Sequence, residues 1–186
     1  MSIQEKIFPF IENYEDLRYD VEGLWSISNP DDAELLSKEI LNFRNNDIHI
    51  LDTTAGLGGN AISFCKNFKN VTCIENNAER FELLKNNLNC FNFSNVTLIN
   101  GNCIEYLNKD YDVIFIDPPW GGPDYKLKSK IDIFLDNINI NEIVKIVSKN
   151  KLIVLKLPFN CNVSFNYLKK IKLNNVIFYF IESSLL

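Results

Sequence analysis

The fold is decided by the stretch Ile48-His49-Ile50-Leu51-Asp52-Thr53-Thr54-Ala55-Gly56-Leu57-Gly58-Gly59-Asn60. The short apolar run over 48–52 predicts a buried strand, the glycines predict a turn, and residues 60–68 have helical spacing. A strand, a glycine turn and a helix in this order are typical of nucleotide-binding α/β proteins. The glycines follow Gly-x-Gly-Gly and not Gly-x-Gly-x-x-Gly, which disfavours a dinucleotide such as NAD.

Similar apolar runs continue along the chain and alternate with helical patterns. Further strands are predicted over 71–75, 96–100, 112–116, 152–156, 169–173 and 176–181, and further helices over 78–89 and 141–149. Short, continuously apolar strands alternating with helices indicate a mostly parallel sheet covered on both faces. The last two strands are predicted to be an antiparallel pair. The order resembles the α/β, seven-stranded, Rossmann-like core of methyltransferases that depend on S-adenosyl-L-methionine (AdoMet).

The first 46 residues precede this core, which we expect to span 47–186. Pro30-Asp31-Asp32 predicts a helix start, and the runs Ile7–Ile11 and Tyr19–Ser28 are apolar and rich in aromatic residues. This helical N-terminal extension is either a simple packing element or a lid over cofactor and substrate.

Composition limits the classes of protein to consider. The chain has 186 residues, 46% of them hydrophobic, enough for a globular domain with a core. No run approaches the roughly 20 apolar residues of a membrane span, and the N-terminus lacks a signal-peptide pattern. Five cysteines without a Cys-x-x-Cys pair indicate reduced thiols and an intracellular protein, and a single histidine argues against a metal site.

The net charge of −5 argues against a broad electrostatic footprint on nucleic acid, although a single nucleotide could still be recognised in a local site. The lysines at 126, 128 and 130 either contact a few phosphates or belong to a solvated loop.

Polar residues at successive strand ends predict a site for AdoMet. Asp52 suits an amino-bearing ligand better than a diphosphate. Glu75 follows Gly56 by 19 residues (75 − 56), at the end of the next strand, where a carboxylate can bind both ribose hydroxyls. Asn102, after the third strand, could hydrogen-bond adenine.

A second motif follows the apolar run 112–116. It reads Asp117-Pro118-Pro119-Trp120-Gly121-Gly122-Pro123-Asp124-Tyr125. Asp117 and the carbonyl of Pro118 can accept hydrogen bonds from an exocyclic amine, and Trp120 offers a stacking face. An indole is the best side-chain partner for a flat cation such as 7-methylguanine. These residues predict methylation of the amino group of a base.

The nine-residue motif closely resembles the corresponding segment of the trimethylguanosine synthases, which methylate guanine N2 of a 7-methylguanosine RNA cap. The resemblance covers most of residues 19–160 and includes Glu22–Ser28, Thr54–Asn60 and Leu157–Asn160. It implies an AdoMet-dependent enzyme that forms 2,7-dimethylguanosine or 2,2,7-trimethylguanosine, with 7-methylguanosine-capped RNA or a cap analogue as partner. We expect a monomer without a metal and without a membrane anchor.

By this resemblance, the segment Glu22–Ser28 helps close over cofactor and cap. The catalytic residues are Asp117, Pro118 and Trp120. Cofactor-binding residues are Ser28, Asp52, Thr54, Ala55, Gly56, Asn60, Glu75, Asn76, Asn102, Cys103 and Asp117. Substrate-binding residues are Ser26, Trp120, Pro123, Tyr125, Lys156 and Asn160.

The chain departs from the family at three positions. Asp117 stands where many relatives have Ser, which adds a charge beside the acceptor amine. Phe159 stands where the family has Arg, so a phosphate contact is lost or moves to Lys156. Asn29 is an insertion between Ser28 and Pro30 that could reshape the lid.

Two other functions stay open at this point. Asp-Pro-Pro-Trp alone fits an adenine-N6 or cytosine-N4 methyltransferase on DNA or RNA equally well, although the Gly-Gly-Pro-Asp-Tyr continuation and the acidic charge oppose this. A cap-binding module that has lost catalysis would keep Trp120 and need no cofactor site, yet Asp52, the glycine turn and Glu75 are all present.

Overall fold

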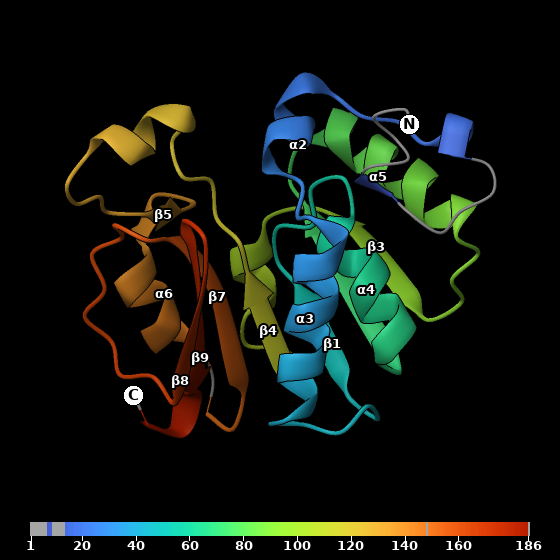
Figure 1. Ribbon diagram of the computed structural model, residues 1–186. Helices are drawn as coiled ribbons and strands as arrows, with labels where there is room; N and C mark the ends of the chain where they lie inside the picture. The colour runs from blue at the N-terminus through green and yellow to red at the C-terminus, as the bar shows by residue number, and fades with distance from the viewer. Residues whose placement is uncertain (1–6, 9–13, 148, 186) are drawn as a thin grey trace. The chain divides into compact units, whose positions relative to one another are not determined.

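The computed structural model describes residues 7–8, 14–147 and 149–185 of the chain (Figure 1). Seven strands form one sheet in the order β3-β2-β1-β4-β7-β9-β8, which confirms the predicted α/β, seven-stranded, mostly parallel fold. By its internal contacts the chain divides into two compact units, which are described separately: unit 1, residues 1–103, and unit 2, residues 104–186. The boundary expected near residue 46 stays a prediction.

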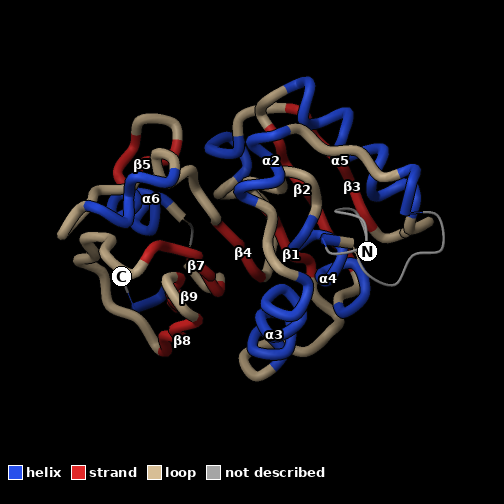
Figure 2. The backbone as a smooth tube through the Cα atoms, turned by 45° about the horizontal axis from the view of Figure 1, so that its top comes forward, coloured by secondary structure: helices blue, strands red, loops and turns tan. Residues whose placement is uncertain are grey.

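Unit 1 contains three parallel strands and most of the helices. Its elements are η1 (Tyr14–Asp16), α2 (Val21–Ser26), α3 (Pro30–Leu41), β1 (His49–Asp52), α4 (Gly59–Asn67), β2 (Asn70–Glu75), α5 (Ala78–Cys90) and β3 (Val96–Asn100), with the 3-10 helix η2 (Cys103–Tyr106) at its end. Helices α3 and α4 lie side by side, and α5 packs along β2 and β3 (Figures 1 and 2).

The sequence explains why these elements form. The strands β1 and β2 pair from His49 with Asn70 to Asp52 with Cys73, and Ile50, Leu51 and Ile74 are fully buried. Helix α3 begins where Pro30 predicted it, because Asn29 caps it by accepting a hydrogen bond from the Asp31 amide. The apolar run Ile7–Ile11 lies partly outside the described residues.

Unit 2 combines parallel and antiparallel pairs. Its elements are β4 (Val113–Ile116), η3 (Pro123–Leu127), β5 (Phe134–Leu135), β6 (Ile138–Asn139), α6 (Ile140–Ile146), β7 (Leu152–Pro158), β8 (Lys169–Leu173), β9 (Val176–Glu182) and η4 (Ser183–Leu185). The strands β4 and β7 are parallel, β9 pairs antiparallel with both β7 and β8, and the predicted antiparallel C-terminal pair is confirmed.

Three features of unit 2 differ from the sequence prediction. The helix predicted over 141–149 ends at Ile146, because Val147 is extended and Asn150 has a φ of 68°. The strand predicted to end at residue 156 continues to Pro158, which pairs with Val176 at the end of the ladder. The small hairpin β5–β6 was not predicted.

The sequence of that hairpin contains residues that favour a tight turn. Its turn residues Asp136 and Asn137 have φ values of 49° and 64°, which is the backbone of a two-residue turn with both central residues left-handed. Asp and Asn tolerate that conformation better than other residues with a side chain.

No helix within the described ranges is long and apolar enough to cross a lipid bilayer.

Candidate functional site

The predicted cofactor turn lies in unit 1 between β1 and α4. Gly56 and Gly58 have φ values of 56° and 98°, so both need a glycine. The amide of Thr54 donates to Oδ1 of Asp52 over 3.2 Å, and the amide of Ala55 donates to the carbonyl of Ile74 over 2.9 Å. Hydrogen bonds to a residue of β1 and to a residue of β2 therefore hold the turn in place.

Glu75 is the residue that joins this turn to the second strand. Its Oε2 accepts a hydrogen bond from the Gly56 amide and its Oε1 one from the Asn77 amide, each over 3.0 Å. The side chain is 7% exposed. Each carboxylate oxygen can accept a further hydrogen bond, so this geometry fits a carboxylate that binds the two hydroxyls of a ribose.

Helix α2 and the segment after it pack directly on the glycine turn. A Cβ atom at Gly23 would come within 2.6 Å of Leu57 Cδ1, and a Cβ atom at Gly59 within 3.0 Å of the Ser28 carbonyl oxygen. Both positions therefore need glycine for close approach. Nδ2 of Asn60 donates to Oγ of Ser28 over 2.8 Å, which ties the segment to the start of α4.

Sequence reasoning missed the residues that anchor this segment. Arg80 on α5 donates to Oδ2 of Asp20 and to Oε2 of Glu22, each over 2.7 Å. The fully buried Asn87 accepts from the Arg18 amide and donates to the carbonyls of Arg18 and Leu57. These contacts join residues that are 30 to 69 positions apart in the sequence, so no local pattern predicts them.

The remaining predicted cofactor residues of unit 1 differ in exposure. Asp52 is 1% exposed at the end of β1. Asn60 is also buried, and its Oδ1 has no hydrogen-bond partner within the described part of the chain, which leaves a buried acceptor beside the turn. Cys103 is buried at the start of η2, Asn102 is half-buried, and Asn76 is exposed in the loop after β2.

Burial and the nearby Asp52 also determine the state of two cysteines. Burial, together with the Asp52 carboxylate, raises the pKa of the Cys65 thiol to about 12 and that of the Cys73 thiol well above its usual value. Both thiols therefore remain protonated at neutral pH, and a protonated thiol is a poor nucleophile.

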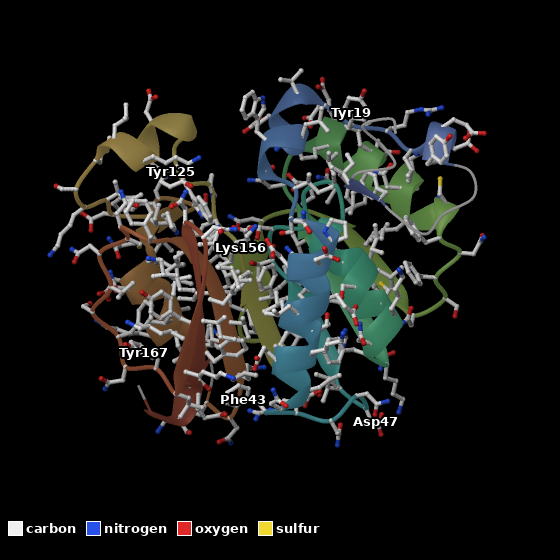
Figure 3. The ribbon with its side chains drawn as sticks, in the orientation of Figure 1. Tyr19, Phe43, Asp47, Tyr125, Lys156 and Tyr167 are labelled. Atoms are coloured by element: carbon white, nitrogen blue, oxygen red, sulfur yellow. The ribbon has the colours of Figure 1, made fainter. Side chains whose placement is uncertain are left out.

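The predicted acceptor site lies in unit 2, where β4 ends. Nζ of Lys156, on β7, contacts Oδ2 of Asp117 over 2.6 Å, and the two side chains are 10% and 15% exposed. Burial raises the pKa of the Asp117 carboxyl, and the Lys156 ammonium opposes that rise. Lys156 lies at the upper end of β7 in Figure 3.

Trp120 lies in the loop between β4 and η3, as the glycines after it predicted. Its ring meets that of Tyr125 edge to face, with centroids 5.2 Å apart and planes at 84°. Nζ of Lys156 is 5.7 Å from the Trp120 ring centroid. The indole is half-buried, and its Nε1 has no hydrogen-bond partner among the residues described.

Asn160 holds the loop that carries Tyr125. Its Nδ2 donates to the carbonyl of Tyr125 over 2.8 Å and to that of Lys128 over 2.7 Å. The side chain is 7% exposed, and Oδ1 has no partner within the described residues. Within unit 2 the structure therefore brings together Asp117, Trp120, Tyr125, Lys156 and Asn160.

Three further predicted site residues lie near β4, in η3 and in α2. Pro118 is buried and follows Asp117 directly. Pro123 begins η3, and its side chain lies outside the described part of the structure. Ser26 is exposed in unit 1, where its hydroxyl donates to the carbonyls of Glu22 and Gly23 in its own helix.

Comparison with known proteins gives a family match. The model of a family described as RNA cap guanine-N2 methyltransferase matches residues 48–177. An uncharacterized protein of Acanthamoeba polyphaga mimivirus is 34% identical over 173 residues, with 88% of this chain and 63% of the relative covered. The trimethylguanosine synthase of Schizosaccharomyces pombe is 30% identical over 139 residues, with 64% of this chain and 57% of the relative covered.

Among solved structures, a Thermus thermophilus 16S rRNA N2 G1207 methyltransferase in complex with AdoMet and guanosine is similar in fold. The TM-score is 0.62 at 15% identity, with 89% of this chain and 43% of that chain covered. The chain thus spans about three fifths of the length of the two curated relatives. The family match gives AdoMet as the cofactor of the chain.

Proposed function

Because the chain belongs to the family of RNA cap guanine-N2 methyltransferases, we propose that it methylates guanine N2 of a 7-methylguanosine cap. The product is 2,7-dimethylguanosine, and a second transfer gives 2,2,7-trimethylguanosine. The observation that carries the proposal is the group at the end of β4, where a buried carboxylate follows a strand and an indole lies three residues beyond it.

Unit 1 holds the cofactor in this proposal. Glu75 binds the ribose hydroxyls, Asp52 receives the amino group of the ligand, and the glycine turn from Thr54 to Asn60 lets the backbone approach it. A Cβ atom at Gly56 would meet nothing within 4 Å, so the turn leaves open space on that side. Ser28, Asn76, Asn102 and Cys103 complete the proposed cofactor set. When bound, AdoMet supplies an electrophilic methyl group on a sulfonium.

Unit 2 holds the acceptor base. Trp120 stacks on the 7-methylguanine, whose positive charge favours an indole face by about 0.5–2 kcal/mol beyond ordinary stacking. Tyr125 and Asn160 lie in the same proposed site, and Pro123 and Ser26 are further proposed substrate contacts. This stacking preference explains why prior methylation at N7 would be a requirement.

Asp117 and Pro118 act on the amine itself. The lone pair of an aromatic amine is delocalised into the ring, which makes the nitrogen a poor nucleophile. Hydrogen bonds from the amine to Asp117 and to the Pro118 carbonyl orient it, and Asp117 accepts the proton that the amine loses. Positioning of the reacting groups and exclusion of water supply the rest of the rate enhancement.

The charges of the two units support a capped RNA as substrate. Residues 104–186 contain eleven lysines and nine acidic residues, whereas residues 1–103 contain eight basic and fifteen acidic ones. Lys126, Lys128 and Lys130 are all exposed next to Tyr125, where phosphates of the cap can reach them. The acidic remainder of the chain gives no broad surface for long RNA.

The experiment that tests the proposal offers four acceptors in parallel. Purified protein is incubated with labelled AdoMet and 7-methyl-GTP, GTP, a 7-methylguanosine-capped RNA or an adenine-containing oligonucleotide. We expect label on 7-methyl-GTP and on capped RNA only, and mass spectrometry of the product counts the methyl groups.

Each other outcome has a distinct meaning. Label on the oligonucleotide alone would assign the protein to the adenine or cytosine amino-methyltransferases. Binding of 7-methyl-GTP without transfer, in a protein that does not bind AdoMet, would indicate a cap-binding module that has lost catalysis.

A further inference from the structure

The ion pair between Asp117 and Lys156 follows from the sheet register of unit 2. Strands β4 and β7 are parallel neighbours in which Ile116 pairs with Leu155, so the next residue on each strand is Asp117 and Lys156. Their charged atoms lie 2.6 Å apart. The pair therefore joins the first residue after β4 to the neighbouring strand β7.

Burial makes this pair necessary. A carboxylate as little exposed as that of Asp117 loses most of its hydration. A lone buried charge tends to neutralise by taking up a proton, and a protonated carboxyl group would no longer accept the amine proton. A cation on the neighbouring strand offsets that tendency.

We propose that Lys156 is a positioning residue of the acceptor site, which keeps Asp117 ionised and fixes its orientation toward the acceptor amine. The inference rests on the proposed function, because it concerns how Asp117 receives that amine. It assigns Lys156 to the carboxylate and not to a phosphate of the cap.

The geometry favours this role over phosphate binding. Nζ of Lys156 is already engaged by Asp117, and its side chain is 10% exposed. The three exposed lysines at 126, 128 and 130 are better placed to contact phosphate. Lys156 also lies 5.7 Å from the Trp120 ring centroid, so the Asp117–Lys156 pair presents little net charge to a cationic base stacked there.

Titratable side chains of β7 and η3 lie close to Asp117 and Trp120. Lys156 faces Asp117 from β7, and Tyr125 and Lys126 stand beyond Trp120 on η3. Burial raises the pKa of Asp117 above the ordinary 3.8, even with Lys156 present. Removal of Lys156 would raise it further, and methyl transfer would then fail at a higher pH than in the wild type.

The test compares Lys156→Met, Lys156→Arg, Asp117→Asn and the double variant Asp117→Asn/Lys156→Met with the wild type. Initial rates with 7-methyl-GTP and labelled AdoMet are measured from pH 4 to pH 9, so that the acid limb of each variant can be located. We expect Lys156→Met to lose about 10- to 100-fold in turnover at pH 7, to move the acid limb of the profile upward by about one pH unit or more, and to recover partly at pH 9. Lys156→Arg should retain most of the activity.

The double variant completes a double-mutant cycle between Asp117 and Lys156. With Asp117→Asn in place there is no carboxylate to hold, so the added Lys156→Met should cost little further turnover. Equal losses from Lys156→Met in both backgrounds would overturn the proposal. It would also be overturned if Lys156→Met left the acid limb unmoved and weakened binding of 7-methyl-GTP but not of 7-methylguanosine, because that result assigns Lys156 to a phosphate.

A measurement without substrate separates this inference from the proposed function. The ¹³C carboxyl resonance of Asp117, assigned by its loss in Asp117→Asn, is titrated in the wild type and in Lys156→Met, with thermal unfolding as a check that both are folded. An upward move of the Asp117 pKa in Lys156→Met supports the pair even if the protein is inactive on 7-methyl-GTP. An unchanged pKa rejects it even if the protein is active.

Discussion

The two units hold their proposed ligand residues in different ways. In unit 1 the glycine turn is fixed mainly by backbone amides, which donate to Asp52, to Glu75 and to the carbonyl of Ile74. In unit 2 the loop after β4 is held by two side chains. Lys156 forms an ion pair with Asp117, and Asn160 donates hydrogen bonds to the carbonyls of Tyr125 and Lys128.

The difference matches what each unit is proposed to recognise. A cofactor is the same molecule in every turnover, so a turn set by the backbone suffices and tolerates few changes. An acceptor differs between related enzymes, and the position of a loop held by side chains can be changed by single substitutions. Substitutions should therefore affect cofactor and acceptor independently, and four variants test this.

The largest expected effect is on the acceptor. Trp120→Ala should lower kcat/KM for 7-methyl-GTP by more than about 100-fold, because stacking on an aromatic side chain contributes about 1–3 kcal/mol per base and the cationic base adds to this. AdoMet affinity, measured by calorimetry, should not change. Tyr167→Ala, which removes an exposed aromatic side chain elsewhere in unit 2 (Figure 3), is the matched control. Unchanged activity in Trp120→Ala would exclude the cap model.

The next effect is on the cofactor. Glu75→Gln keeps the shape of the side chain but removes its charge, so the bonds from Gly56 and Asn77 and the ribose contacts all weaken. Hydrogen bonds to charged groups contribute about 1.5–3 kcal/mol, which predicts about 10- to 100-fold weaker AdoMet binding with unchanged binding of 7-methyl-GTP. Glu79→Gln, an exposed acid in the first turn of α5, controls for the lost charge. Equal AdoMet affinity in both variants would remove Glu75 from the cofactor site.

These two variants concern residues that the sequence identified, and the reason is local. Glu75 ends a short apolar strand and Trp120 lies four residues beyond the end of another, and the carboxyl ends of parallel strands are where ligands bind in open α/β sheets. Similar strand patterns predicted all seven strands of the sheet and its mostly parallel order. The central strands such as β4 and β7 are continuously apolar because they are buried on both faces, whereas the edge strands β3 and β8 are only partly buried.

What the sequence did not reveal depends on contacts between distant residues. Arg80 meets Asp20 across 60 positions, and Lys156 meets Asp117 across 39, so neither ion pair follows from spacing. Lys156 was predicted as a substrate contact only because Phe159 replaces the family Arg. The partner on the adjacent strand became visible once the register of β4 and β7 was known.

A smaller effect is expected where a side chain holds the acceptor loop. Asn160→Ala leaves the carbonyls of Tyr125 and Lys128 without their donor, which should lower the free energy of unfolding by about 1–2 kcal/mol. Turnover of 7-methyl-GTP should fall by about 10-fold or less, since Trp120 and Asp117 remain. Asn162→Ala, whose amide donates to the exposed Asp132, is the control. A loss of AdoMet affinity in Asn160→Ala would contradict the separation of the two sites.

The smallest expected effect concerns the anchor of the N-terminal segment in unit 1. Arg80→Met removes the ion pairs to Asp20 and Glu22, whose side chains are 38% and 78% exposed, so solvent screening limits the loss in unfolding free energy to about 0.5–1 kcal/mol. Lys85→Met on the same helix, which loses an i,i+3 pair with Glu82, is the control.

The pH dependence of this loss identifies its cause. Burial raises the pKa of the Asp20 carboxyl, but the hydrogen bonds from Arg80 and from the Gly23 amide outweigh burial, so the net pKa lies below the ordinary 3.8. A carboxyl whose pKa is lower in the folded than in the unfolded state contributes stability above its unfolded pKa and loses it as the pH falls through the folded value. The difference between wild type and Arg80→Met in denaturant unfolding should therefore be full at pH 6 and shrink toward pH 3. A difference that stays constant over that range would mean that Arg80 acts through the packing of its aliphatic stem and not through its charge.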